Sequence, residues 1–276
     1  MKISGIVLLL AFFCTVAPSQ SPSDVSAPVE ISFYGNQNFS NDELLENFKS
    51  SAGDSWKQYD ERAFEYFAQK YTRGLMFSKG FWRAKIIEIT SAPRAGKQIV
   101  RILVDEGPRF RMGTIKVKGN EAITTKTILE MLGQRQGSAA DGKAVQDLLY
   151  ETLKDKYCDL GFVQYNAEFE PDFVEPGNGN SDGVVNVLIT IDEGRQFKLR
   201  RLEFVGIESD EAEQLAQSFP LKSGDVYIQS KLEKWASAIN ETKRFAFLDK
   251  DRHVQIRTDE EAADLDLEIS LKKLLP

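Results

Sequence analysis

The sequence predicts an α+β protein made of three tandem copies of one small domain. The first observation is a returning segment: Ile31-Ser32-Phe33-Tyr34-Gly35-Asn36 recurs as residues 115–120 and, altered, as residues 202–207. The second is a constant spacing, because 18 residues separate Gly35 from Gly53, Gly119 from Gly137 and Gly206 from Gly224. The third is an order of apolar patterns that each copy repeats. Such periodicity favours a modular array over a single catalytic globule.

In the first copy, the alternation in Val29–Phe33 predicts a half-buried strand that ends at Gly35-Asn36. Ser40 and the acidic residues after it predict the start of a short helix that stops near Gly53. An apolar stripe predicts a longer helix closed by Gly80, with Phe64, Phe67, Tyr71 and Leu75 on one face. Two strands follow, at 81–90 and 98–104, with a turn at 93–96. The element order is β-α-α-β-β.

The second copy repeats this order, with Gly161-Phe162 in place of Gly80-Phe81 and strands at 163–169 and 184–191. The third has Arg244-Phe245 at that point and a hairpin from 253–257 and 265–271. We therefore expect domains at residues 29–107, 108–194 and 195–276. Each should be a three-stranded mixed sheet covered by two helices, with the third domain the least regular copy.

The N-terminus has the pattern of an exported protein. Lys2 followed by the apolar run 6–13 and then small residues predicts a secretory signal peptide at 1–21, with a flexible Ser/Pro/Ala leader at 22–28. The cleavage site stays open between Ser19-Gln20-Ser21 and Val25-Ser26-Ala27. An uncleaved anchor is the weaker alternative, because the run is shorter than the roughly 20 residues of a spanning helix. A lipoprotein through Cys14 is weaker still, because Phe13 precedes it.

Composition argues against several classes of function. The formal net charge of −7 disfavours a nucleic-acid partner. His253 is the only histidine, which excludes a multi-histidine metal site, and no HExxH or phosphate-binding loop motif is present. Cys158 is the only cysteine left once the signal is removed, so no internal disulfide is expected. We interpret His253 and Cys158 as structural and expect no enzyme activity and no cofactor.

The joints between copies also repeat, as Val104-Asp105-Glu106-Gly107 and Ile191-Asp192-Glu193-Gly194. Neither joint contains a long Pro/Ser linker, so adjacent domains should be closely coupled. Glu106 and Glu193 can also be taken as paired catalytic acids, but they belong to different domains. We interpret Glu106, Gly107, Glu193 and Gly194 as inter-domain joints.

Strand-Gly-Asn, two helices, Gly-Phe, a hairpin and the Glu-Gly joint together resemble the polypeptide-transport-associated (POTRA) domain. The resemblance covers residues 29–273 and is weakest in the third copy. It implies a periplasmic protein, with association to the outer membrane left open, that handles unfolded outer-membrane polypeptides and docks partners. The tandem POTRA region of outer-membrane β-barrel assembly factors precedes a barrel. No barrel strands follow Leu271, so we expect a separate barrel partner or a free periplasmic module, with only indirect membrane contact.

The order β-α-α-β-β lets the first and last strands run parallel, which leaves the middle strand at a sheet edge. An exposed edge can pair with an extended client strand, a mode called β-augmentation. Alternatively, charged residues on the edge block pairing. The candidate binding residues on the edges 81–90, 163–170 and 253–257, with Trp82 possible as a surface side chain, are Phe81, Trp82, Arg83, Lys85, Ile87, Val163, Tyr165, Ala167, His253 and Gln255.

Two functional hypotheses follow. The first is a scaffold or chaperone-like module that binds unfolded outer-membrane polypeptides or a barrel assembly factor. The second is a structural envelope adaptor that joins folded partners and handles no client.

Overall fold

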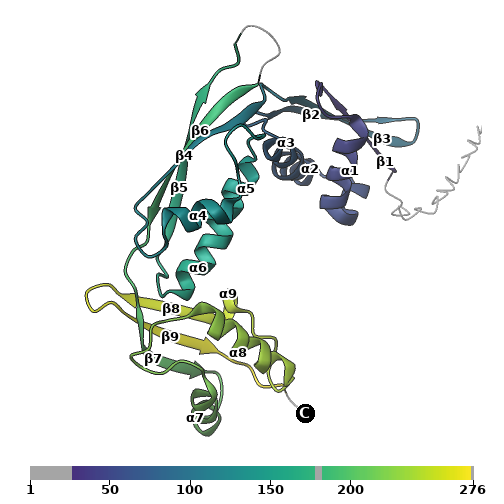
Figure 1. Cartoon of the computed structure of the whole chain (residues 1–276). Helices are drawn as coiled ribbons and strands as arrows, with labels where there is room; N and C mark the ends of the chain where they lie inside the picture. The colour runs from purple at the N-terminus through teal and green to yellow at the C-terminus, as the bar shows by residue number, and fades with distance from the viewer. Residues whose placement is uncertain (1–26, 178–181, 275–276) are drawn as a thin grey trace, which may run out of the picture.

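The computed structural model describes residues 27–177 and 182–274. The predicted signal peptide and the leader up to residue 26 lie outside the described residues. Three sheet-and-helix units follow one another along a curved array (Figure 1). In the first two units the helices lie on the concave side of the curve and the sheets on the convex side.

Each unit contains one three-stranded mixed sheet, as predicted. The strand orders are β1-β3-β2, β4-β6-β5 and β7-β9-β8. The first strand of each unit pairs in parallel with the last, and the hairpin strands pair antiparallel. The strands are β1 Val29–Tyr34, β2 Lys85–Arg94, β3 Lys97–Asp105, β4 Phe110–Lys118, β5 Asn166–Val174, β6 Gly183–Asp192, β7 Lys198–Val205, β8 Val254–Asp259 and β9 Asp264–Ser270.

Two helical segments cover each sheet. The short ones are α1 Asn41–Ala52, followed by the 3-10 turn η1 Gly53–Lys57, α4 Thr125–Leu132 and α7 Ser209–Ser218. In the first two units a π-helical turn interrupts the long helix at equivalent positions. These segments are α2 Glu61–Phe67, η2 Ala68–Thr72 and α3 Arg73–Ser78, then α5 Gly142–Asp147, η3 Leu148–Leu153 and α6 Lys154–Asp159. The long helix of the third unit, α8 Gln229–Glu241, is regular, and a short helix α9 Lys250–His253 precedes β8.

The cores form by burial of the predicted stripes between sheet and helices. Three separate clusters of buried side chains exist, one per unit. Phe64 in the first, Leu149 in the second and Leu232 in the third are almost fully buried. Trp82 crosses this division, because it belongs to the first unit but is buried in the core of the second.

The first strand of each hairpin was predicted to begin too early in the sequence. β2 starts at Lys85 rather than Phe81, β5 at Asn166 rather than Val163, and β8 at Val254 rather than His253. The aromatic and branched residues before β2 and β5 have high strand propensity. Here they are packed into cores instead: Phe81 lies in the core of the first unit, Trp82 in that of the second, and Val163 packs against that of the third.

The glycine that ends the first strand of each unit is a packing requirement as well as a turn. A Cβ added at Gly119 would lie 2.0 Å from the Ile191 carbonyl oxygen, and one at Gly35 would lie 2.1 Å from that of Val104. Both glycines also have positive φ. The close approach of the last strand therefore fixes glycine at this position.

We predict that Gly119→Ala lowers the free energy of unfolding more than Gly133→Ala. Both positions have left-handed φ, which costs an L-residue about 1–2 kcal/mol. Gly133 has open space around it, whereas Gly119 adds a backbone overlap worth about 1–3 kcal/mol more. Urea unfolding of the two variants measures the difference; equal losses would contradict the close-approach argument.

Candidate functional site

The edge strands are the first candidate site. In each sheet the first hairpin strand (β2, β5 or β8) pairs only with the last strand of its unit among the described residues. Four of the sequence-predicted binding residues lie on these edges: Lys85 and Ile87 on β2, Ala167 on β5 and Gln255 on β8. Ile87 is 53% exposed at a β-bulge, while Ala167 is buried. The structure thus does not bring the predicted residues together into one site.

The other six predicted residues are not on edge strands. Phe81, Trp82 and Arg83 precede β2, Val163 and Tyr165 precede β5, and His253 ends α9. Phe81 is buried in the core of the first unit. The His253 imidazole accepts a hydrogen bond from the Asp249 backbone N–H through Nδ1 at 3.0 Å, which closes the turn of α9.

Trp82 is not a surface side chain. It is 9% exposed, and its indole N–H donates to the Ala140 carbonyl at 2.8 Å. Its ring packs edge-on against Phe77 of the first unit and against Phe169 and Phe173 of the second. Trp82 therefore joins the first two units. The sequence alone does not distinguish this role, because an aromatic residue directly after the Gly-Phe pair suits an exposed edge strand equally well.

Arg83 belongs to the same joint. Its guanidinium lies 4.3 Å from the ring centroid of Phe173 and pairs with Glu175 at 2.6 Å. At the second joint Val163 packs against the core of the third unit, and the Gln164 amide donates to Glu260 at 3.1 Å. The residues after Gly-Phe thus contact the following unit at both joints.

A backbone hydrogen bond repeats at both joints. The Phe110 N–H donates to the Gly80 carbonyl, and the Phe197 N–H donates to the Gly161 carbonyl, each at 2.9 Å. A Cβ at Gly80 would lie 2.7 Å from the Phe110 carbonyl oxygen. The glycine at the end of the long helix is therefore where the next unit approaches closely. The third copy has Arg244 at this position, paired with the buried Glu211.

Each joint carboxylate forms hydrogen bonds within its own unit. Glu106 is buried and accepts hydrogen bonds from the backbone N–H groups of Gln37 at 2.7 Å and Asn38 at 3.0 Å, in the loop after β1. Glu193 accepts equivalent bonds from Glu121 at 2.7 Å and Ala122 at 2.9 Å. Each carboxylate thus holds the end of the last strand against the loop after the first.

The glycines after these acids shape the turn into the next unit. Gly107 and Gly194 have φ of +63° and +67°. Their N–H groups donate to Asp105 at 3.0 Å and Asp192 at 3.1 Å. Two copies of one turn therefore direct the chain identically into the second and third units.

The three edges differ in how well they could accept another strand. β2 contains Pro93 and a bulge at Ile87. β5 contains Pro171, which lacks an N–H donor, and the exposed acids Glu168 and Glu170, which make no ion pair with any described residue. β8 has a continuous register with β9 and no proline. Bulges, prolines and free charges all discourage edge pairing, so β8 is the least protected edge.

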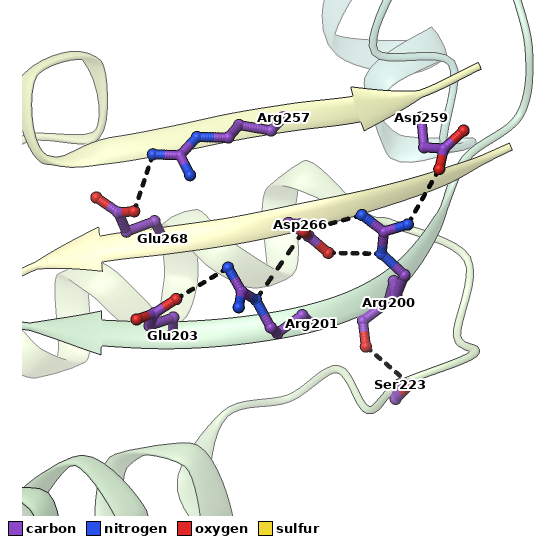
Figure 2. Close-up of polar contacts among 8 residues, drawn as sticks. All are labelled: Arg200, Arg201, Glu203, Ser223, Arg257, Asp259, Asp266 and Glu268. Atoms are coloured by element: carbon purple, nitrogen blue, oxygen red, sulfur yellow. Dashed lines mark hydrogen bonds and ion pairs between the residues drawn. The ribbon is translucent and has the colours of Figure 1, made fainter. Parts of the chain in front are cut away.

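The charged side chains of β8 form ion pairs within their own sheet. On one face of the sheet, Arg257 pairs with Glu268 of β9 at 3.1 Å, and Asp259 pairs with Arg200 of β7 at 3.1 Å (Figure 2). Arg200 also forms a two-pronged pair with Asp266, at 2.9 and 3.0 Å. The hydrogen bonds from Arg200 lower the pKa of Asp266, and Asp266 in turn raises the pKa of Arg200.

Other chemistry has little support in the described structure. Between residues 27 and 177 and between 182 and 274, no group of three or more His, Cys, Asp or Glu side chains is placed to hold a metal ion. Cys158 is buried, and burial raises the pKa of its thiol, so it is a poor nucleophile. No described helix has the length and apolarity needed to cross a membrane.

Comparisons with known proteins show which family the second unit resembles and which solved structure shares the fold. Residues 110–194, the second unit, match the family model described as POTRA, surface antigen variable number repeat. The crystal structure of Haemophilus influenzae BamA POTRA3-5 superposes with a TM-score of 0.70 at 18% identity, covering 90% of this chain and 96% of that chain. The second unit is therefore similar to the POTRA family, and the chain as a whole shares the fold of that structure.

Two curated relatives are outer-membrane assembly proteins by name. The outer membrane protein assembly factor BamA of Neisseria meningitidis is 22% identical over 214 residues, or 74% of this chain and 26% of the relative. The putative outer membrane protein assembly factor of Treponema pallidum is 21% identical over 248 residues, or 83% of this chain and 29% of the relative. The chain thus spans less than a third of the length of these relatives.

We predict that Trp82→Ala loosens the first joint. Removing a buried tryptophan from the second core should cost about 3–5 kcal/mol of unfolding free energy. Trp56→Ala is the control, because Trp56 is only partly buried and lies under Lys49, a contact worth about 1 kcal/mol. Small-angle scattering should show a wider range of inter-unit angles for Trp82→Ala only. An unchanged scattering profile would count against the joint role.

We also predict that Arg200→Gln raises the pKa of Asp266 toward the ordinary aspartate value. Because the folded-state pKa is depressed, this pair stabilises the fold above that value, and the stabilisation is lost as the pH falls through the lowered pKa. Carboxyl carbon NMR titration measures the shift. Arg201→Gln is the control, since its contact with Asp266 is 3.9 Å and should matter less. The same Asp266 titration in wild type and Arg200→Gln would refute the assignment.

Proposed function

We propose that the protein is a non-enzymatic periplasmic scaffold for outer membrane protein assembly. It binds extended segments of outer-membrane polypeptides, or of a barrel assembly partner, along its sheet edges. The observation that carries this proposal is that, among the described residues, the first hairpin strand of each sheet pairs on one side only. The names of the curated relatives support the process, and main-chain pairing suits clients of many sequences.

The joints support the same function. The hydrogen bonds from Phe110 to Gly80 and from Phe197 to Gly161, together with the buried Trp82, restrain rotation between units. Binding sites on restrained units keep fixed spacings. One extended client can then contact more than one edge without a further entropic cost for fixing the units relative to one another. We also propose that the three domains span residues 29–107, 108–194 and 195–276.

A structural adaptor for folded envelope partners is the second candidate. Phe247 is 73% exposed and Leu274 is 49% exposed in the third unit. Phe247 stands at the position of Arg83 and Gln164, both of which contact the next unit in the array. An exposed aromatic ring at that place favours contact with another folded protein.

The two candidates predict different results with an unfolded outer-membrane barrel protein diluted from urea. A client scaffold should reduce its light scattering in proportion to the scaffold concentration. Phe247→Ser should leave that reduction unchanged but weaken crosslinked recovery of folded envelope proteins. If the intact chain does not reduce scattering while crosslinking recovers folded partners through Phe247, the adaptor replaces the scaffold.

A further inference from the structure

The outer face of the second sheet is divided into a basic side and an acidic side. Val187 and Ile189 of β6 point into the core, so the alternate residues of the three strands point away from the helices. All the charged side chains among them on the two outer strands are exposed. They are Lys116 and Lys118 on β4, and Glu168, Glu170 and Asp172 on β5.

The strand register orders these charges in rows across the sheet. Written from β4 through β6 to β5, two rows are Lys116-Leu188-Glu170 and Lys118-Thr190-Glu168. Each lysine lies two strand spacings, about 10 Å, from the glutamate of its row, and an uncharged residue lies between them. The second unit does form ion pairs, but those among the described residues use other side chains, such as Arg111 with Asp182. The charges of the two rows are therefore not neutralised within the described sheet.

The third sheet shows the opposite arrangement. Its outer face also carries many charges, but opposite signs lie on neighbouring strands (Figure 2). Arg257 of β8 pairs with Glu268 of β9 at 3.1 Å, and Arg200 of β7 pairs with Asp266 of β9 at 2.9 Å. Scattered exposed charges are ordinary solvated surface. What distinguishes the second sheet is the separation of the two signs onto opposite sides of one face.

The middle of this face is hollowed. A depression of about 430 Å³ lies over Leu188, with Lys116 on one side and Glu170 and Asp172 on the other. A lysine side chain from another molecule has room there, because its methylenes can lie on Leu188 while its ammonium group meets the two carboxylates.

A second copy of the chain matches this face in charge. A twofold axis parallel to the strands, midway between two facing sheets, exchanges the basic and acidic sides. Each lysine of one copy then lies over the glutamate of the same row in the other copy, and Leu188 lies over Leu188. Sheets that pack face to face keep their strands nearly aligned and about 10 Å apart, which suits this symmetry.

The shape of the array leaves this face accessible. The second unit lies in the middle of the curve, and its sheet is on the convex side (Figure 1). Two curved arrays placed back to back touch at their middle units, while their ends diverge. The first and third units therefore do not obstruct the contact.

We propose that the protein forms a twofold-symmetric dimer through the outer face of its second sheet. Three strands about 30 Å long give a contact of about 400 Å² per copy. The total of about 800 Å² is below the roughly 1,200 Å² of a stable interface, so the dimer is weak and reversible. The proposal goes beyond the scaffold function and involves no pairing along a sheet edge.

The first measurement is sedimentation equilibrium of the chain without its predicted signal peptide, residues 22–276. At low salt the chain should show a monomer–dimer equilibrium as its concentration rises toward about 1 mM. Salt at about 0.5 M should weaken the dimer several-fold, because it screens the facing charges.

Two double variants test the charge pattern. Lys116→Glu with Lys118→Glu makes both sides of the face acidic, and Glu168→Lys with Glu170→Lys makes both sides basic. Each variant alone should dimerise at least about tenfold more weakly than the wild type, because like charges then face each other. An equimolar mixture of the two should dimerise again, because every row then faces the opposite charge.

A third double variant is the matched control. Lys126→Glu with Lys156→Glu makes the same change in net charge at exposed positions on α4 and α6, which cover the other face of the sheet. It should dimerise like the wild type. When it is mixed with the basic variant, it should form less mixed dimer than the acidic variant does, because its own lysines on β4 face the new lysines. Circular dichroism confirms that each variant folds.

A wild-type chain that stays monomeric up to about 1 mM at low salt would overturn the proposal. So would a dimer that both charge reversals leave unchanged, or one that the reversals weaken without recovery in the mixture. These outcomes leave the scaffold function standing, because suppression of scattering by an unfolded barrel protein measures that function separately.

Discussion

The array depends on one backbone hydrogen bond that the chain makes twice. The N–H of Phe110 reaches the Gly80 carbonyl, and the N–H of Phe197 reaches the Gly161 carbonyl. This bond places the first strand of each new unit against the helix end of the previous one. Only glycine permits the approach at Gly80, and the residues after the glycine are then available to enter the next unit. Trp82 does so most deeply, with its indole hydrogen-bonded inside the second core.

The same contact creates the surfaces between units. The hydrogen bond from Phe197 to Gly161 places the third unit beside the end of α6. Residues of η3, α6 and β8, Tyr150 among them, line one cleft there. β5 packs against Trp82 of the first unit through Phe169 and Phe173, and it carries Pro171 and exposed acids that make no ion pair among the described residues. Three copies of one fold therefore have different edges, because each edge is modified by its own sequence and by the unit that lies beside it.

Much of the fold could be predicted from the sequence because the patterns are local. Strand alternation, capping Ser40 and the apolar helix stripe act within a few residues, and the 18-residue glycine spacing repeats them three times. The candidate site was predicted less well. Trp82 is compatible with an exposed edge strand and with a buried joint, because an aromatic side chain occurs in both places. The residues of the cleft, such as Tyr150 and Ile256, are 106 positions apart and share no pattern.

The sequence by itself determined the number of units, their order of elements and the sheet position of each hairpin strand, because short-range propensity and periodic burial specify these. Tertiary structure alone decided that Trp82 is buried across a joint and that Glu106 binds the loop after β1. It alone decided that β8 faces a cleft. The physical reason is that these contacts join groups far apart in the chain. Their geometry depends on the angle between packed units, which no local pattern encodes.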